Sequence, residues 1–315
     1  MQTRRLGKTD LTFTAIGLGT WAQGGGEWAF GWGDQDDRAS IDTIHAAVDA
    51  GVNWVDTAAV YGFGHAEEVL GRALKELGEK PLVATKCARI AGADGKPMGC
   101  MKADSIRQEC EDSLRRLGVE VIDLYQLHWP QPDEDIEEGW QAMAGLVQAG
   151  KVRHIGVSNF SVDQMKRCLP IHAIASLQPP YSMLRRDIEK EILDFCAAQE
   201  IGVICYSPMQ KGLLTGKVTA DWVAALPGND HRGQDPMFKQ PELGAILAKV
   251  DQLKLVAEGL GITMAQLSIA WVLRHPAMSS AIVGGRKPSQ IRETAQAGDR
   301  VLGADVVGDI ELILG

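Results

Sequence analysis

The chain has 315 residues, of which 45% are hydrophobic, and this is enough to bury a large core in one domain spanning residues 1–315. Its formal net charge of −9, from 41 acidic and 32 basic residues, leaves no extended positive surface for a nucleic-acid backbone. No apolar stretch reaches the roughly 18 residues of a membrane span, and no signal-type segment follows the polar start. We therefore expect a cytoplasmic protein with no membrane partner.

Short runs rich in Val, Ile and Leu alternate about eight times with longer segments of helical apolar spacing. Such alternation is typical of βαβ units, and at this length it predicts an α/β barrel. We expect strands at residues 15–20, 52–56, 82–86, 121–127, 153–157, 173–177, 202–206 and 280–283. We expect helices at residues 39–50, 65–77, 104–117, 135–149, 161–168, 187–199, 263–274 and 288–297.

Three further segments lie outside this repeat. Residues 3–13 contain the turn-forming run GKTD and predict a hairpin over the barrel floor. Residues 207–241 contain no clear strand and several glycines and prolines, which is typical of a functional lid, and a helix is expected at 242–259. Only a short tail follows residue 298, so we expect an open mouth.

Side-chain patterns also predict two helix starts. Asp104 and Ser105 are placed to cap the helix at 104–117, and Gly118 to end it. Thr263 followed by Gln266 predicts a capping box.

An open doubly wound sheet is the alternative fold, because local patterns do not report barrel closure. Its dinucleotide-binding version would carry a GxGxxG fingerprint. Gly17 and Gly19 supply only the first two glycines, and the run at residues 24–26 is out of register. The sequence therefore favours the barrel.

Three titratable residues follow or end short apolar runs, namely Asp56, Lys86 and His128, and Tyr61 lies a few residues beyond Asp56. In a parallel barrel these strand ends meet at one mouth. A tyrosine is a useful acid near neutrality only if a neighbour stabilises its phenolate, and a lysine held by a carboxylate does so. His128 would orient a carbonyl or share in proton delivery. This combination predicts proton transfer to a carbonyl that accepts hydride.

Four motifs resemble those of the aldo-keto reductase superfamily, in order and at its spacing: residues 56–62 (DTAAVYG), 84–86 (ATK), 127–128 (LH) and 156–160 (GVSNF). The resemblance extends over about residues 3–298. It implies a (β/α)8 TIM barrel that uses a nicotinamide cofactor without a Rossmann domain. It also implies reversible reduction of aldehydes or ketones, with Tyr61 as general acid/base, Lys86 and Asp56 tuning it, and His128 orienting the carbonyl.

The resemblance also implies where the cofactor binds. Ser158, Asn159 and Gln178 are similar to the family's partners of the nicotinamide carboxamide, and Tyr206 to its ring-stacking aromatic. From the residues alone, Ser158 and Asn159 would be a helix cap, and Tyr206 a half-buried aromatic at a strand end. The expected cofactor contacts are Gly19, Thr20, Trp21, Ser158, Asn159, Gln178, Tyr206, Ser207, Pro208, Gln210, Lys211, Gly212, Leu213, Lys217, Gly284, Gly285, Arg286, Gln290, Glu293 and Thr294.

Two of these segments suit phosphate groups. Residues 209–217 (MQKGLLTGK) resemble the loop that folds over the pyrophosphate, since their glycines allow close approach and their lysines favour phosphate. Residues 283–290 resemble the segment that receives the adenosine phosphate, although residues 282–285 (IVGG) and Thr294 differ from the family's commoner IPKS and Asn. Arg286, with a fork suited to bidentate phosphate binding, favours NADP(H) over NAD(H).

The substrate is expected to be a small carbonyl compound or alcohol. Trp21 and Trp129 lie on loops at the mouth and are the expected pocket wall, whereas Trp28 and Phe30 are expected only to hold their loop in place. The histidines show no shared metal-ligand spacing, so we expect no metal. We expect a monomer or a weak homo-oligomer.

Two other functions are compatible with the same fold. One is a nicotinamide-binding regulatory subunit with slow turnover, as in the potassium-channel β-subunits of the superfamily. The other is an aldolase that forms a Schiff base on Lys86, although a neighbouring Asp56 would keep that amine charged.

Overall fold

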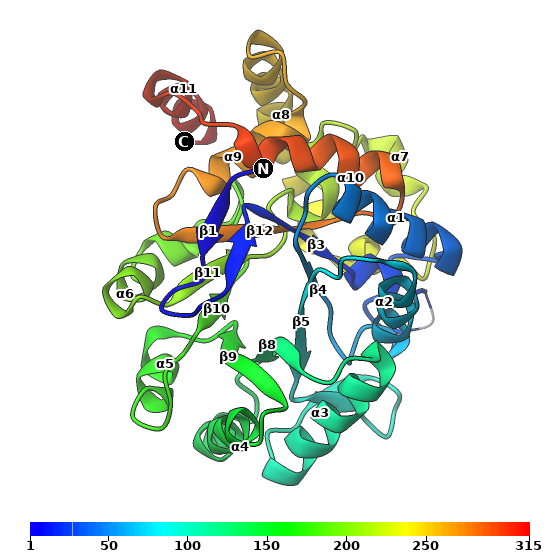
Figure 1. Cartoon of the computed structure of the whole chain (residues 1–315). Coiled ribbons are helices and arrows are strands. Elements are labelled where there is room, and N and C mark those ends of the chain that lie inside the picture. Colours follow the sequence, from blue (N-terminus) through cyan, green and yellow to red (C-terminus); the bar gives the residue numbers. More distant parts are fainter. Residues whose placement is uncertain (27) are drawn as a thin grey trace.

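The computed structural model describes residues 1–26 and 28–315. Eight parallel strands form a closed barrel in the order β10-β11-β12-β3-β4-β5-β8-β9 (Figure 1). The barrel strands are β3 (Ile16–Gly19), β4 (Trp54–Asp56), β5 (Leu82–Cys87), β8 (Ile122–Leu127), β9 (Val152–Ser158), β10 (Ser176–Gln178), β11 (Gly202–Cys205) and β12 (Met278–Gly284). The last strand pairs with the first, Ala281 opposite Ile16, so the sheet is closed and the open-sheet alternative is wrong.

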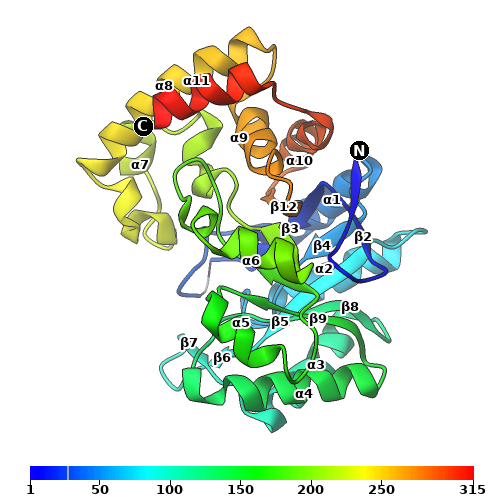
Figure 2. The same ribbon diagram turned by 90° about the vertical axis from the view of Figure 1, so that its left-hand side faces the viewer.

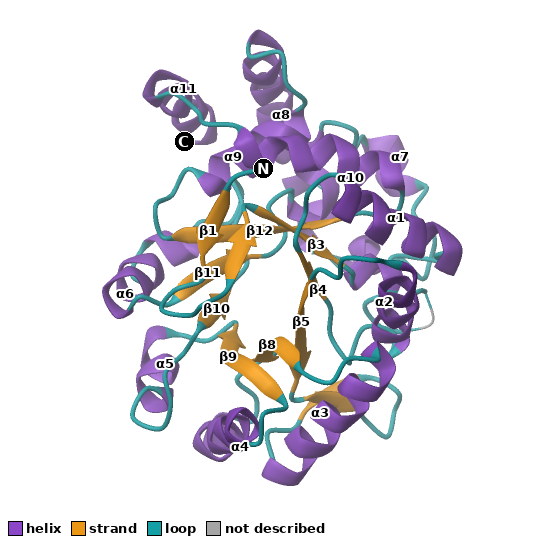
Figure 3. Cartoon of the chain, viewed as in Figure 1, coloured by secondary structure: helices purple, strands orange, loops and turns teal. Residues whose placement is uncertain are grey.

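Helices surround these strands on the outside (Figure 3). The ring comprises α1 (Asp37–Asp49), α2 (His65–Glu76), α3 (Ala103–Leu117), α4 (Ile136–Gln148), α5 (Val162–Cys168), α6 (Ile192–Gln199), α9 (Met264–Leu273) and α10 (Pro288–Ala295). Three more helices are α7 (Ala220–Ala224), α8 (Glu242–Gly259) and α11 (Ala304–Leu314). The predicted (β/α)8 TIM barrel is confirmed.

The barrel floor is closed by the predicted hairpin of β1 (Thr3–Arg5) and β2 (Thr12–Thr14). Phe13 of this hairpin stacks on Trp54 inside the barrel, with ring centroids 4.3 Å apart. A Cβ atom at Gly17 would lie 2.1 Å from the Trp54 ring. Gly17 is therefore required by the packing of the barrel interior. This explains why a glycine of the incomplete GxGxxG pattern is present without a dinucleotide-binding turn.

The helix boundaries agree with most of the predicted starts. Thr263 and Gln266 form the expected capping box of α9, and Gly118 ends α3 in the left-handed conformation with φ of 65°. The predicted cap of α3 is wrong, because the helix begins at Ala103 and both Asp104 and Ser105 lie within it. Ser105 instead donates a hydrogen bond to Glu109, one turn further along α3.

Two structured segments were not predicted. The connection after β5 contains a hairpin of β6 (Arg89–Ala91) and β7 (Pro97–Gly99). The tail contains α11, which packs against α8 (Figure 2). The predicted helix at 187–199 is in fact a short 3-10 turn (Asp187–Glu189) followed by α6.

The insertion at residues 207–241 contains α7 and 3-10 turns at Gln210–Thr215, His231–Gln234 and Pro236–Phe238. Across residues 1–26 and 28–315, no single helix is long and apolar enough to cross a bilayer. The pair α8 and α9 meets that test only when taken together, and it is bent by 88°.

Candidate active site

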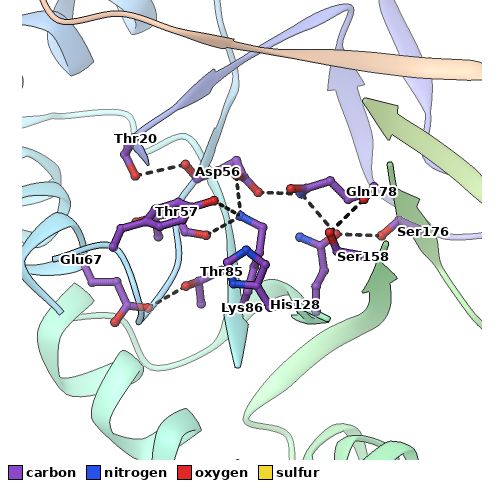
Figure 4. A network of polar contacts seen from close by, with 12 residues as sticks. Thr20, Asp56, Thr57, Glu67, Thr85, Lys86, His128, Ser158, Ser176 and Gln178 are labelled. Atoms are coloured by element: carbon purple, nitrogen blue, oxygen red, sulfur yellow. Dashed lines mark hydrogen bonds and ion pairs between the residues drawn. The ribbon is translucent and has the colours of Figure 1, made fainter. Parts of the chain in front are cut away.

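The four predicted catalytic side chains meet at the mouth of the barrel, and Figure 4 shows three of them, Asp56, Lys86 and His128, whereas Tyr61 is placed there by its contacts with Lys86 and His128. Asp56 ends β4, Lys86 lies in β5 and His128 follows β8. In the ladder, Asp56 is opposite Ala84, and residues two apart in a strand point to the same side, so Lys86 reaches the same interior region. The Lys86 ammonium donates to Asp56 Oδ2 at 2.6 Å, to the Thr57 carbonyl at 2.9 Å and to the Tyr61 hydroxyl at 3.2 Å.

This ion pair is buried, since Asp56 is 2% and Lys86 1% exposed. Burial raises the pKa of Asp56 and lowers the pKa of Lys86, while the contact between them favours the charged form of each. Asp56 receives further support from across the barrel, where Gln178 of β10 donates to its Oδ1 at 2.9 Å. The carboxylate thus accepts hydrogen bonds on both oxygens, which offsets the free-energy cost of removing it from water.

Tyr61 and His128 are both buried, and their surroundings favour the uncharged form of each side chain. Burial, together with the charge of Asp56, raises the pKa of Tyr61 well above 10, so the phenol keeps its proton at neutral pH. Burial and the charges of Lys86 and Arg89 hold the pKa of His128 well below 6.5. The two rings lie nearly perpendicular, with centroids 5.7 Å apart. A neutral imidazole retains one N–H donor.

Asp56, Tyr61 and His128 line a cavity of about 910 Å³, and most of the predicted cofactor residues lie on its wall. Its wall includes Trp129 and, contrary to the expectation of a loop-holding role only, Trp28 and Phe30. Thr20 and Leu213 are not part of the wall, because both are fully buried. The Thr20 hydroxyl instead donates to the backbone carbonyl of Asp56. The predicted cofactor residues on the wall are Gly19, Trp21, Ser158, Asn159, Gln178, Tyr206, Ser207, Pro208, Gln210, Lys211, Gly212, Lys217, Gly284, Gly285, Arg286, Gln290, Glu293 and Thr294.

Polar side chains on one part of the wall form a connected network. The Tyr206 hydroxyl donates to Asn159 Oδ1 at 2.9 Å, and the Asn159 amide donates to the carbonyl of His128 at 3.0 Å. The interpretation of Ser158 and Asn159 as a helix cap is wrong, because Ser161 caps α5 in a capping box with Gln164. Ser158 and Asn159 lie on the cavity wall and are not used to cap α5.

Cations on the opposite part of the wall are held in place. Lys211 pairs with Asp235 at 2.7 Å, and Lys217 with Glu293 at 3.3 Å. The Arg286 guanidinium donates to the carbonyls of Trp32 and Asp34 and to the side chain of Gln35. Arg286 thus joins the segment after β12 to the loop after β3.

Sequence reasoning missed a contact between that loop and the insertion at 207–241. His231 stacks on Trp21 with ring centroids 5.0 Å apart, and its Nδ1 lies 3.0 Å from the carbonyl of Gly31. The Arg232 guanidinium lies over the Trp32 ring at 4.5 Å. No periodicity signals such a contact between two irregular segments, although a cluster of tryptophans opposite a lid is a hint.

Two other residues near the site were missed. Arg89 lines the cavity close to His128, and Glu67 lies behind the site, bonded to the hydroxyl of Thr85. Arg89 lies three residues after the motif at 84–86 and Glu67 five residues after the motif at 56–62, and this proximity is a weak signal. Within residues 1–26 and 28–315, no group of three His, Cys, Asp or Glu side chains is arranged to hold a metal ion.

Comparison with known proteins assigns the chain to a family. The family model described as "Aldo/keto reductase family" matches residues 15–314. The chain is 38% identical to the aldo-keto reductase YhdN of Bacillus subtilis, covering 100% of this chain and 94% of the relative. It is 35% identical to the NADH-specific methylglyoxal reductase of Escherichia coli, covering 93% and 92%.

Solved structures agree. A glycerol dehydrogenase from Gluconobacter oxydans superposes with a TM-score of 0.90 at 39% identity, covering 99% of this chain and 94% of that one. An aldo/keto reductase from Klebsiella pneumoniae, solved in complex with NADP and acetate, has a TM-score of 0.75 at 27% identity, covering 100% and 96%. The chain therefore belongs to the aldo/keto reductase family.

Proposed function

We propose that the protein reversibly reduces small aldehydes or ketones to alcohols, with a nicotinamide cofactor as the hydride source. One observation carries this proposal: a single buried ammonium, that of Lys86, touches both the Asp56 carboxylate and the Tyr61 phenol at the wall of a large cavity. Such an arrangement serves to stabilise a phenolate, which is the state that a tyrosine reaches after it donates its proton.

In this proposal each side chain has a separate task. Tyr61 gives its proton to the carbonyl oxygen as the carbonyl carbon accepts hydride, and takes the proton back in the oxidative direction. Lys86 stabilises the phenolate electrostatically, and Asp56 keeps Lys86 charged and in position. Neutral His128 donates a hydrogen bond to the carbonyl oxygen and fixes its orientation. The bound nicotinamide supplies the hydride.

The residues on the cavity wall suit such a cofactor. The Tyr206 ring offers a stacking surface, and Ser158, Asn159 and Gln178 offer polar groups for a carboxamide. Lys211 and Lys217 are placed for phosphates. We infer a preference for NADP(H) from Arg286, whose planar guanidinium suits an additional phosphate group. The similar proteins include one solved in complex with NADP and one named NADH-specific, so the preference has to be measured for this protein.

The substrate is proposed to be small and oxygenated. A methylglyoxal reductase and a glycerol dehydrogenase among the similar proteins act on compounds of this kind. The aromatic rings of Trp21 and Trp28 lie beside Tyr61, with centroids 6.3 and 6.0 Å away, and form an aromatic wall next to the proposed acid. The aldolase alternative is disfavoured, because an ammonium with three acceptors has no lone pair for Schiff-base formation.

The decisive experiment compares Tyr61→Phe with the unmodified protein on a panel of small aldehydes and polyols, with NADPH and NADH. We expect kcat to fall by about 100-fold or more, because the proton donor is lost. Cofactor binding, followed by fluorescence titration, should remain nearly unchanged. Tyr125→Phe is the matched control, since Tyr125 is buried in the outer core and does not line the cavity.

Unchanged turnover in Tyr61→Phe would refute the assigned acid. Tight nicotinamide binding without turnover of any compound by the unmodified protein would instead support the regulatory-subunit alternative.

A further inference from the structure

The order of strands in the barrel separates two ends of the cavity. In a ring of eight, β5 lies opposite β11, and β8 lies opposite β12. The phosphate-type loops at residues 209–217 and 283–290 follow β11 and β12. The segments that follow β5 and β8 therefore face the end of the cavity that is remote from those loops, where a substrate would project away from the cofactor.

Arg89 lies at this remote end. It begins β6, three residues after Lys86, and lines the cavity together with His128 and Trp129. Its guanidinium donates to Gln131 Oε1 at 3.2 Å. Its charge lies near enough to help lower the pKa of His128, and partial burial lowers its own pKa. Arg89 is thus a half-buried cation beside the carbonyl-orienting imidazole.

The other buried or half-buried cations of the cavity wall already have partners. These partners are Asp235 for Lys211, Asp230 for Arg232, and two backbone carbonyls together with the Gln35 side chain for Arg286. Among residues 1–26 and 28–315, the Arg89 guanidinium has no carboxylate within salt-bridge distance and one side-chain hydrogen bond, to Gln131, whereas Arg286 has three acceptors. A guanidinium has five N–H donors, and one neutral amide oxygen leaves most of them available.

We propose that Arg89 binds a carboxylate of the substrate, so that the preferred substrates are aldehydes or ketones that carry a carboxylate a few carbon atoms from the carbonyl. Carboxylates match the planar fork of arginine bidentately, and partial desolvation strengthens the contact. The inference rests on the proposed carbonyl reduction. In that reaction the carbonyl carbon gains hydride, its oxygen gains the Tyr61 proton, and the carboxylate is unchanged.

The test compares succinic semialdehyde with its methyl ester, which has the same carbonyl but no charge. For the unmodified protein we expect kcat/KM for the acid to exceed that for the ester by about 10-fold or more, since the ester lacks the charge that a charge-assisted contact with Arg89 requires. In Arg89→Gln this ratio should fall to about one. The Arg89→Lys variant, which keeps the charge but not the fork, should give an intermediate ratio.

Arg185→Gln is the matched control, because Arg185 also lines the cavity but is exposed and follows β10. It should leave the acid-to-ester ratio unchanged. An acid-to-ester ratio near one in the unmodified protein, or a ratio that survives in Arg89→Gln, would overturn the proposal. A ratio lost in Arg185→Gln and retained in Arg89→Gln would do so as well.

A second measurement does not depend on turnover. Calorimetric titration with the product hydroxy acid and with uncharged butanol should show tighter binding of the acid, and Arg89→Gln should remove this difference. If no carbonyl compound is turned over with either nicotinamide, the proposed function fails, and this titration still decides whether Arg89 binds a carboxylate. Equal binding of the acid by both proteins would rule it out.

Discussion

At the scale of single residues, the site combines groups whose charges depend on each other. The Lys86 ammonium is the centre, because it joins Asp56, the Thr57 carbonyl and Tyr61. His128 lies beside this group and is kept neutral by burial and by the nearby positive charge. The same neutrality that suits carbonyl orientation also makes the stability of the fold depend on pH.

The pKa of His128 is lowered in the folded protein and ordinary, about 6.5, in the unfolded chain. The folded state therefore binds fewer protons than the unfolded chain. The contribution of neutral His128 to stability is present above about pH 6.5 and is lost as the pH falls toward the lowered pKa. Between about pH 7.5 and pH 5.5, we expect His128 alone to reduce the free energy of unfolding by roughly 1 kcal/mol. Urea titration of the unmodified protein and of His128→Gln at both pH values measures this contribution.

The comparison isolates His128, because other histidines with a lowered pKa, such as His231 and His275, are present in both proteins. The variant should lose less stability over this interval. An equal loss in both proteins would show that His128 is protonated in the folded state.

The convergence of the proposed catalytic residues was predictable because strand ends in a parallel barrel meet at one mouth. Asp56, Lys86 and His128 needed only a correct strand assignment. The bond from Gln178 to Asp56 was not predictable, because it crosses the barrel between strands that are 122 residues apart in sequence. Arg89 could not be recognised either, since its importance depends on which carboxylates lie nearby in space.

At the scale of elements, a buried carboxylate fastens three of them together behind the site. Glu67 of α2 accepts from the Thr85 hydroxyl of β5 at 2.6 Å and from Arg116 of α3 at 2.7 Å. Helix α2 directly follows the loop that carries Tyr61, and Thr85 precedes Lys86 in β5. The contact between Glu67 and Thr85 therefore fixes helix α2, which follows the Tyr61 loop, relative to strand β5, which carries Lys86 (Figure 4).

Glu67→Ala would leave the Arg116 charge, which is 14% exposed, without its partner. We expect a loss of about 3–5 kcal/mol in the free energy of unfolding, as is typical when one member of a buried ion pair is removed. Asp112→Ala is the control, because the neighbouring pair Asp112–Arg115 is on the surface and should contribute less than about 1 kcal/mol. Urea denaturation monitored by tryptophan fluorescence measures both. Similar losses in the two variants would contradict the structural role of Glu67.

Elements with a strong apolar period were predictable, whereas those defined by a distant partner were not. Helix α11 has only Ile310 and Leu314 buried, and Leu312 is 83% exposed, so its periodic signal is weak. It is held by α8, which is itself an addition to the repeat. The β6–β7 hairpin has strands of three residues, too short for an alternating pattern.

At the scale of the whole molecule, closure unites the two ends of the repeat. β12 pairs with β3, and the backbone N–H of Gln2 donates to Asp299 at 2.8 Å. We therefore propose that residues 1–315 form one domain that unfolds as a unit. Closure was the part of the fold that local patterns left open, because it depends on the pairing of strands more than 260 residues apart.

This unity allows a test of cofactor choice that does not depend on activity. A ligand at about 100 times its Kd stabilises the folded state by about 2.7 kcal/mol, so NADPH should shift a single thermal transition upward as a whole. Arg286→Ala should reduce the shift by NADPH and leave the shift by NADH nearly intact. Calorimetry measures the shifts. Two separate transitions would contradict the single domain, and equal losses with both nicotinamides would contradict the role of Arg286.

The opposed positions of β5 and β11 have a consequence for engineering. The proposed reacting groups lie on strands or near strand ends, while the hairpin after β5 and the insertion after β11 are separate segments on opposite sides of the same barrel mouth. We expect that replacing the connection between Cys87 and Met101 would change substrate preference and leave the proposed cofactor site, on the opposite side of the mouth, unchanged. Substrate preference and cofactor preference could then be changed separately in the same barrel.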